Sequence, residues 1–510
     1  MIWLIAKKDF FQNLLSARFI IGFLLCLVII PFTLIVGVDQ YNNQVRTYRI
    51  DKGKQENKWE KEIRVYSQVR PEIIIEPEPL SILSNGIGNN LGNSVRVNLG
   101  EYPLFPDSHN STRDNPLLNA FFSIDFSRVI SILVSLLALV FSYDLFSRER
   151  EDGTMKMVFS NRISRPAFLA GKLSGIIITL VPILLFCFIL GVLVIVISPS
   201  VQFGANDWSG IILLLLSSFI YMIVFILIGM LISSRVQRSS TSIIMCLLCW
   251  IWFLFLMPNI ASYMARSFVK IEMYDNVLFA MNDINKTYSK ERNERWKAID
   301  QEMGMGGVIS HSNYSSGPDG VEIMSGCTWE VNEFHRRLNI WKEPARIDYA
   351  DKKWAIQKQY LDGLVHQENV QKYISWLSPA GLFEQTAEVL CRTSPESFLK
   401  YMEHVRNYRE TLVRYFKENK LFESYSYFTP QPESTFPKEE DYKTVDILPD
   451  SWNPESYPVL NLNDVPRFEY KGATTASMIH DSLGRVIALL GICAVLLAVT
   501  IVSFIRYDIR

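Results

Sequence analysis

Six apolar stretches dominate this 510-residue chain. Crossing about 30 Å of hydrocarbon takes roughly 20 helical residues, and soluble cores rarely contain charge-free runs of that length. The stretches therefore predict six transmembrane helices, which we place at residues 18–38, 126–146, 173–198, 209–234, 242–264 and 485–505.

The charged residues are segregated from these stretches. The chain has 51 basic and 52 acidic residues, a net charge of −1 and 49% hydrophobic residues. Such a balance requires large aqueous parts beside the spans, and it gives no global argument for nucleic-acid binding. We expect a multi-pass membrane protein that has lipid, and no nucleic acid, as a partner.

The distribution of Lys and Arg predicts the orientation. If the N-terminus lies inside, the short inner segments are 1–17, 147–172, 235–241 and 506–510, taken with Arg18 at the start of the first span. They carry thirteen cations and five acids, which gives about +8 in a small part of the chain. We therefore predict that both termini are cytoplasmic.

Residues 1–17 have an amphipathic pattern, which predicts a helix lying in the inner membrane surface; the alternative is a cytoplasmic extension of the first span. Two larger segments, 39–125 and 265–484, then lie outside. Alternating residues at Ile63–Val69 and Val95–Leu99 predict a β-rich first domain. Helical patterns predict a mainly α-helical second domain. The expected fold class is an α-helical membrane protein with six spans, an interfacial N-terminal helix and these two extracytoplasmic domains.

The inner loop 147–172 contains the most specific local pattern. Gly153 is expected to break the helix of the second span, and Asp152 or Thr154 can cap a new one. The short helix Thr154–Ser160 would present apolar side chains to a groove on a partner. We predict that these are Met155, Val158 and Phe159, with Glu149, Glu151, Arg162 and Arg165 orienting the helix at the rim. A solvated hairpin is the alternative.

Catalytic chemistry is not indicated. The sequence has no Gly-x4-Gly-Lys-Ser/Thr phosphate loop, and all six histidines fall in predicted external segments. Asp144, at the inner end of the second span, is expected to pair with Arg148 at i+4. We predict no catalytic residue, no metal site and no cofactor bound by this chain.

Seven cysteines divide between spans and external segments. Cys327 and Cys391 are the two predicted to lie outside, so they form the candidate disulfide. The alternative is two buried thiols.

Two groups of motifs resemble those of ABC-2 type permeases. The inner loop has Arg148-Glu149…Glu151-x-Gly153-Thr154, followed by Ser160…Ser164-Arg165…Lys172. The external segments Pro77–Gly86 and Leu377–Leu390 resemble those of the larger members, which have two big external domains.

This resemblance implies a transmembrane subunit in a bacterial inner membrane, working with separate ATPase subunits that bind the ATP. It also implies a second permease subunit, the same or different. Residues 1–17 would be the elbow helix, and Thr154–Ser160 the coupling helix. ATP hydrolysis by the partner would drive export or mechanical work on the external side, where an envelope protein is a further candidate partner. The alternative function is a membrane-anchored envelope binding or assembly protein without transport.

Overall fold

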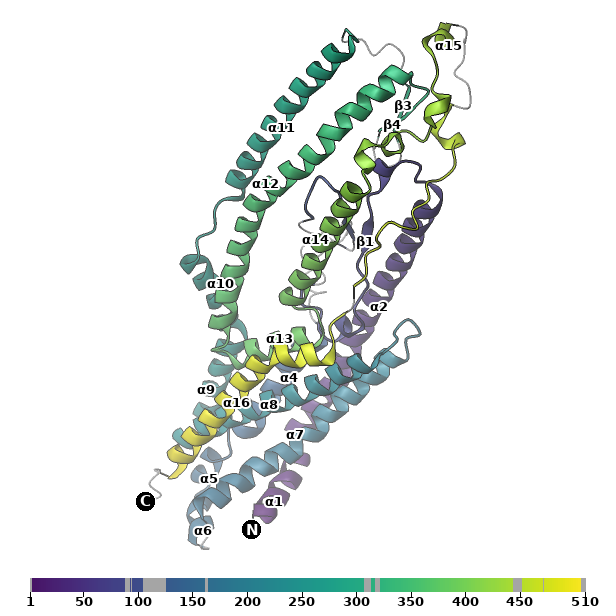
Figure 1. Ribbon diagram of the computed structural model, residues 1–510. Coiled ribbons are helices and arrows are strands. Elements are labelled where there is room, and N and C mark those ends of the chain that lie inside the picture. Colours follow the sequence, from purple (N-terminus) through teal and green to yellow (C-terminus); the bar gives the residue numbers. More distant parts are fainter. Residues whose placement is uncertain are drawn as a thin grey trace.

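The computed structural model describes residues 2–87, 92, 94–103, 125–160, 164–306, 313–316, 322–443, 452–470 and 472–505. The protein is elongated. A bundle of long apolar helices forms one end, and a second helical domain extends from this bundle to the other end (Figure 1). It is 77% helical and 2% strand.

Among the described residues, six helical segments are long and apolar enough to span a membrane, as the sequence predicts. They are α2 (Ala17–Lys61), the segment Phe126–Glu151 that begins with α4 (Phe126–Ser142), α7 (Arg165–Val196), α8 (Ala205–Arg235), the continuous α9–η5–α10 and α16 (Thr475–Ile505). Helices α4 and α8 form the centre of the bundle. In the most apolar stretch of each of these two spans, 67% and 61% of the residues are buried inside the protein, against 11% in α16.

The fifth span is interrupted by a wider turn. Helix α9 (Ser239–Ile251) and helix α10 (Met257–Phe268) are joined by the π-helical segment η5 (Trp252–Leu256). Pro258 lies just after this segment and has no backbone N–H, so the regular helical hydrogen bonds cannot continue through it.

The N-terminal helix α1 (Ile2–Leu14) is separate from α2. Ser16 caps α2, where its Oγ accepts a hydrogen bond from the backbone N–H of Phe19 at 3.3 Å. Helix α1 packs along α7, and its Ala6 and Asp9 are buried.

We use the name protruding domain for residues 39–103, 269–375 and 395–470. Its long helices are the second half of α2, α11 (Tyr274–Met303), α12 (Trp329–Ser375) and α14 (Pro395–Glu418), with the short α15 (Glu439–Lys443) near the tip (Figure 1). Between α12 and α14, helix α13 (Pro379–Leu390) packs into the span bundle against α8 and α16.

The predicted β-rich first domain is wrong. The described strands form two small antiparallel sheets, β1 (Glu72–Ile74) with β2 (Ser94–Arg96) and β3 (Asn313–Ser316) with β4 (Glu322–Ser325). The reason is that α2 runs on as a helix to Lys61 through a polar stretch without proline, which leaves few residues for strands. The alternation at Ile63–Val69 forms a 3₁₀ turn, η1 (Tyr66–Gln68), and connecting chain instead.

The two segments predicted as separate external domains share one hydrophobic core. Ile63, Val69 and Val97 from the first segment lie in one buried cluster with Met402 and Leu412 from the second. The protruding domain is therefore a single packed unit built from both segments.

Candidate functional site

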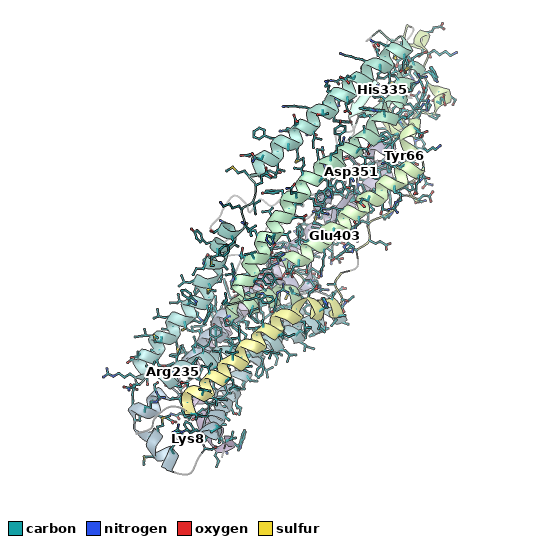
Figure 2. The ribbon with its side chains drawn as sticks, turned by 60° about the vertical axis from the view of Figure 1, so that its left-hand side comes forward. Lys8, Tyr66, Arg235, His335, Asp351 and Glu403 are labelled. Atoms are coloured by element: carbon teal, nitrogen blue, oxygen red, sulfur yellow. The ribbon has the colours of Figure 1, made fainter. Side chains whose placement is uncertain are left out.

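The hairpin between α4 and α7 contains two short helices, α5 (Ser147–Glu151) and α6 (Thr154–Ser160). Gly153 separates them in a left-handed conformation, with φ of 66°, that favours glycine. The predicted helix break at Gly153 and the predicted range of the second helix are both confirmed. We call the end of the bundle that carries α1, α5 and α6 the hairpin end; Lys8 and Arg235 lie there (Figure 2).

Helix α5 is fastened to the turn between α8 and α9. The guanidinium of Arg150 donates to the carbonyl oxygens of Ser234 and Val236, at 2.7 and 2.8 Å. Glu151 accepts from the backbone N–H and the hydroxyl of Ser239, at 3.1 and 2.6 Å. A cation therefore meets the C-terminal end of α8 and an anion meets the N-terminus of α9, as the two helix dipoles favour.

A buried ion-pair triad ties α5 to α1 and α7. Lys172 Nζ lies 2.6 Å from Glu149 Oε1 and 3.2 Å from Asp9 Oδ1. The Lys172 and Asp9 side chains are only 9% and 7% exposed, and burial raises the pKa of Asp9 although Lys172 opposes the shift. Asp9 Oδ2 and Glu149 Oε2 are buried without a hydrogen-bond partner among the described residues. One lysine thus holds two carboxylates from different helices.

Two glycines on α7 allow this close packing. A Cβ atom at Gly171 would lie 2.9 Å from Cβ of Ile5, and one at Gly175 would lie 2.9 Å from Cβ of Asp9. Larger residues would push α1 away from α7 and separate Asp9 from Lys172.

Four phenylalanines from four elements form an aromatic cluster beside the triad. Phe159 of α6 contacts Phe168 of α7 and Phe504 of α16, with ring centroids 5.4 and 6.2 Å apart. Phe146, at the end of the α4 span, lies 4.7 Å from Phe504. The cluster joins the hairpin to the ends of three spans.

Two of the three residues predicted for the docking face of α6 face the chain's own spans. Met155 is 3% exposed inside the main core, and Phe159 faces the aromatic cluster, so both side chains serve the contact with the spans. Among the side chains of α6 that the structure describes, Met157 is apolar and points outward, with 71% of its surface exposed. The sequence could not distinguish the two contacts, because a short amphipathic helix has an apolar face whether that face meets a partner or its own protein.

The described rim residues also contact other parts of this chain. Glu149 and Glu151 bind Lys172 and Ser239, while the guanidinium of Arg165 donates to the carbonyl oxygen of Ile505 at the end of α16. Thr154 Oγ1 donates back to the carbonyl oxygen of Glu149 at 3.3 Å. The side chain of Val158, and the whole of Arg162, lie outside the described residues.

Asp144 pairs with a different residue from the one predicted. Arg18, near the start of α2, lies 2.8 Å from Asp144 Oδ2, whereas Arg148 pairs with Asp152 at 3.8 Å. Neither of these pairings, Arg18 with Asp144 or Lys172 with Asp9, was predicted from the sequence. The available signal was an acid and a base close to the apolar runs of different spans.

The predicted Cys327–Cys391 disulfide is not formed. Cys327 lies in the core of the protruding domain, and Cys391 lies at the end of α13 in the core of the span bundle. The two thiols therefore belong to different parts of the molecule.

The opposite end of the bundle, where the spans meet the protruding domain, has its own ion pairs. We call it the far junction. Arg392 follows α13 with φ of 62°, and its guanidinium contacts Asp207 at the start of α8 and, at 3.1 Å, Glu78. Burial raises the pKa of Glu78 to about 7 although Arg392 lowers it.

A second pair of contacts crosses the same junction. Arg485 of α16 lies 2.6 Å from Glu396 of α14, and Lys372 of α12 lies 3.2 Å from the same carboxylate. The start of α16 is thereby held against two helices of the protruding domain.

Comparison with known families identifies one match. The family described as ABC-2 family transporter protein matches residues 3–509, which is nearly the whole chain. No curated protein matches the sequence.

Proposed function

Because this chain belongs to the ABC-2 transporter family, we propose that it is the permease subunit of an ABC transporter, working with a separate ATPase subunit. One observation carries the coupling: the α5–α6 hairpin is fixed at once to α1, α7, the α8–α9 turn and α16. A force applied to this hairpin is passed directly to several spans. ATP binding and hydrolysis are assigned to the partner.

The proposed orientation puts the hairpin end in the cytoplasm of a bacterium and the protruding domain on the outer side of the inner membrane. The excess of about eight positive charges in the short segments at the hairpin end supports this arrangement. Both termini are then cytoplasmic, and α1 is the elbow helix.

The contact with the ATPase is proposed on the outward side of α6, around Met157. An exposed, flexible methionine suits docking into an apolar groove, and the neighbouring Arg148 and Asp152 are both more than half exposed. The inward contacts of Met155 and Phe159 then transmit the motion.

A second permease subunit is proposed against the spans that the chain itself leaves open. Only 22% of the apolar window of α2 and 11% of that of the fifth span is buried, so lipid or another subunit must cover the remainder. The output is either export between two permeases or mechanical work by the protruding domain.

Co-purification tests the coupling proposal. Met157→Asp should weaken ATPase recovery at least about tenfold, since a charge replaces a central apolar contact. Met273→Asp is the matched control, because Met273 is 75% exposed near the other end of the fifth span. If both variants recover the ATPase and its stimulated hydrolysis at the wild-type level, α6 is not the docking helix.

A further inference from the structure

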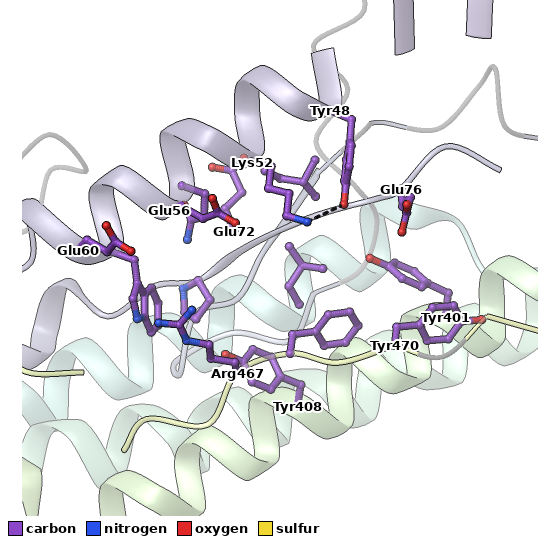
Figure 3. Close-up of a pocket in the computed structure, with 16 residues that line it drawn as sticks. Tyr48, Lys52, Glu56, Glu60, Glu72, Glu76, Tyr401, Tyr408, Arg467 and Tyr470 are labelled. Atoms are coloured by element: carbon purple, nitrogen blue, oxygen red, sulfur yellow. Dashed lines mark hydrogen bonds between the residues drawn. The ribbon is translucent and has the colours of Figure 1, made fainter. Parts of the chain in front are cut away.

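A cavity of about 350 Å³ lies inside the protruding domain, away from the hairpin end. Its walls come from four separate segments: the second half of α2, the chain through β1 (residues 71–76), α14, and residues 467–470 (Figure 3). A volume of this order accommodates a small organic molecule or a few side chains of a peptide.

Six aromatic side chains line the cavity: Tyr48, Trp59, Tyr401, Tyr408, Phe468 and Tyr470. Tyr401 is buried and packs edge-on against Tyr470 and Phe468, with centroids 4.9 and 6.0 Å away. Tyr408 is fixed by its hydroxyl, which donates to the carbonyl oxygen of Pro466 at 2.9 Å. These contacts hold part of the aromatic wall in place before any ligand arrives.

The charges around the cavity favour a cation. Glu56, Glu60, Glu72 and Glu76 line it together with the cations Lys52 and Arg467, which leaves an excess of two negative charges. Glu72 is held by the hydroxyl of Ser94 at 2.7 Å, while the other three carboxylates belong to exposed residues.

The wall already holds one ammonium group. Lys52 Nζ lies 5.4 Å from the ring centroid of Tyr48 and 3.3 Å from its hydroxyl oxygen (Figure 3). This ammonium is held at the hydroxyl edge of the ring by a hydrogen bond. The negative faces of aromatic rings also attract cations, so the other rings of the wall could receive the cation of a ligand. The indole Nε1 of Trp59 is buried and has no acceptor among the described residues, which leaves a donor on the wall for a ligand oxygen.

We propose that this cavity binds an organic cation with an apolar body. The ligand is an ammonium or guanidinium compound, either free or as a Lys or Arg side chain of an external peptide. The aromatic rings would cover its apolar part and its charge, and the surplus carboxylates would neutralise it. An anion would meet the excess of Glu residues, and a neutral ligand would leave their charge uncompensated.

Binding to the purified full chain, without any ATPase, tests this inference. The probes are benzyltrimethylammonium, a blocked arginine–tyrosine–arginine tripeptide and its neutral citrulline counterpart, measured by calorimetric titration. We expect the arginine peptide to bind at least about tenfold more tightly than the citrulline peptide, and the difference to shrink with added salt. Binding of benzyltrimethylammonium as well would indicate a free cation as the source; binding of the peptide alone would indicate a peptide.

Variants locate the site. The combined change Glu56→Gln, Glu60→Gln and Glu76→Gln should weaken cation binding about tenfold, and the three exposed residues leave folding intact. Glu403→Gln on the exposed side of α14 is the matched control (Figure 2). Equal binding of charged and neutral peptides, no binding of either cation, or an unchanged affinity in the triple variant would each overturn the proposal. Because no ATPase is present, such a failure would leave the permease proposal standing.

Discussion

The hairpin end and the far junction use the same arrangement of charge in different backbone settings. At each place one cation lies between two carboxylates: Lys172 between Asp9 and Glu149, and Arg392 between Asp207 and Glu78. Lys172 sits on a regular helix, whereas Arg392 has a left-handed backbone and contacts a loop. The comparison shows that the same charge arrangement is built on an unstrained helix at the hairpin end and on a strained backbone where the spans meet the protruding domain.

The largest effect is expected at the hairpin end. Lys172→Met should lower the free energy of unfolding by about 3–5 kcal/mol, because two buried carboxylates lose their shared cation. Thermal unfolding in detergent measures the loss, and Lys8→Met, at an exposed position on α1, is the control. Adding Asp9→Asn and Glu149→Gln to Lys172→Met should restore part of the stability. A wild-type melting curve for the single variant would remove the distinction between the two ends.

The corresponding change at the far junction should cost less. Arg392→Ala should lower stability by about 2–3 kcal/mol, since hydrogen bonds to charged groups are lost in a partly exposed site. Arg392→Gly loses the same contacts but relieves the left-handed backbone, so it should be about 1 kcal/mol more stable than the alanine variant. Equal stability of the two variants would show that the backbone at residue 392 carries no strain.

Removing an aromatic contact separates anchoring from docking. Phe159→Ala should cost about 2 kcal/mol, since the half-buried ring leaves the cluster with Phe168 and Phe504. We expect ATPase recovery to remain while ATP hydrolysis becomes less dependent on the permease. If Phe159→Ala no longer recovered the ATPase while Met157→Asp still did, the docking face would be the one that includes Phe159.

The smallest effect is a pH dependence confined to the far junction. The pKa of Glu78 is raised by burial to about 7, so the folded state holds a proton that the unfolded state loses near pH 4.5. The contribution of Glu78 to stability is therefore greatest below about pH 4.5 and is lost as the pH rises to about 7. Glu78 is one-third exposed, so solvent screening limits the effect to about 1 kcal/mol.

Hydrogen exchange at residues 78–83 can measure this slope. Glu388 also has a pKa raised by burial, to about 8, so the informative quantity is the difference between the wild-type protein and Glu78→Gln. The variant should exchange with a weaker pH dependence at the junction and unchanged rates in α5. An identical profile in both proteins would contradict the assignment to Glu78.

Features encoded locally were predictable from the sequence. The six apolar runs, the break at Gly153 and the helix Thr154–Ser160 each depend on neighbouring residues, and the structure contains all of them. Contacts between residues that are distant in the chain were not predictable in this way. Arg18 and Asp144 are 126 positions apart, and Lys172 and Asp9 are 163 apart, so local spacing could not pair them.

The cavity in the protruding domain was also not predictable from local spacing in the sequence. Its walls lie near residues 48–60, 71–76, 401–408 and 467–470, and no spacing rule brings these segments together. The strand prediction failed for a related reason: the apolar alternation at Ile63–Val69 is real, but those residues pack into a core shared with α14 instead of a sheet.

Helix α2 continues without a break from the span bundle into the protruding domain. Beyond residue 38, α2 continues for 23 residues to Lys61, which is about 35 Å at 1.5 Å per residue. Its tip is clamped to the protruding domain, where Leu460 donates to the carbonyl oxygen of Ile63 at 2.9 Å. A tilt of α2 by about 10° would therefore sweep this tip sideways by roughly 6 Å, so small rotations of its membrane-spanning half would become larger displacements of the protruding domain.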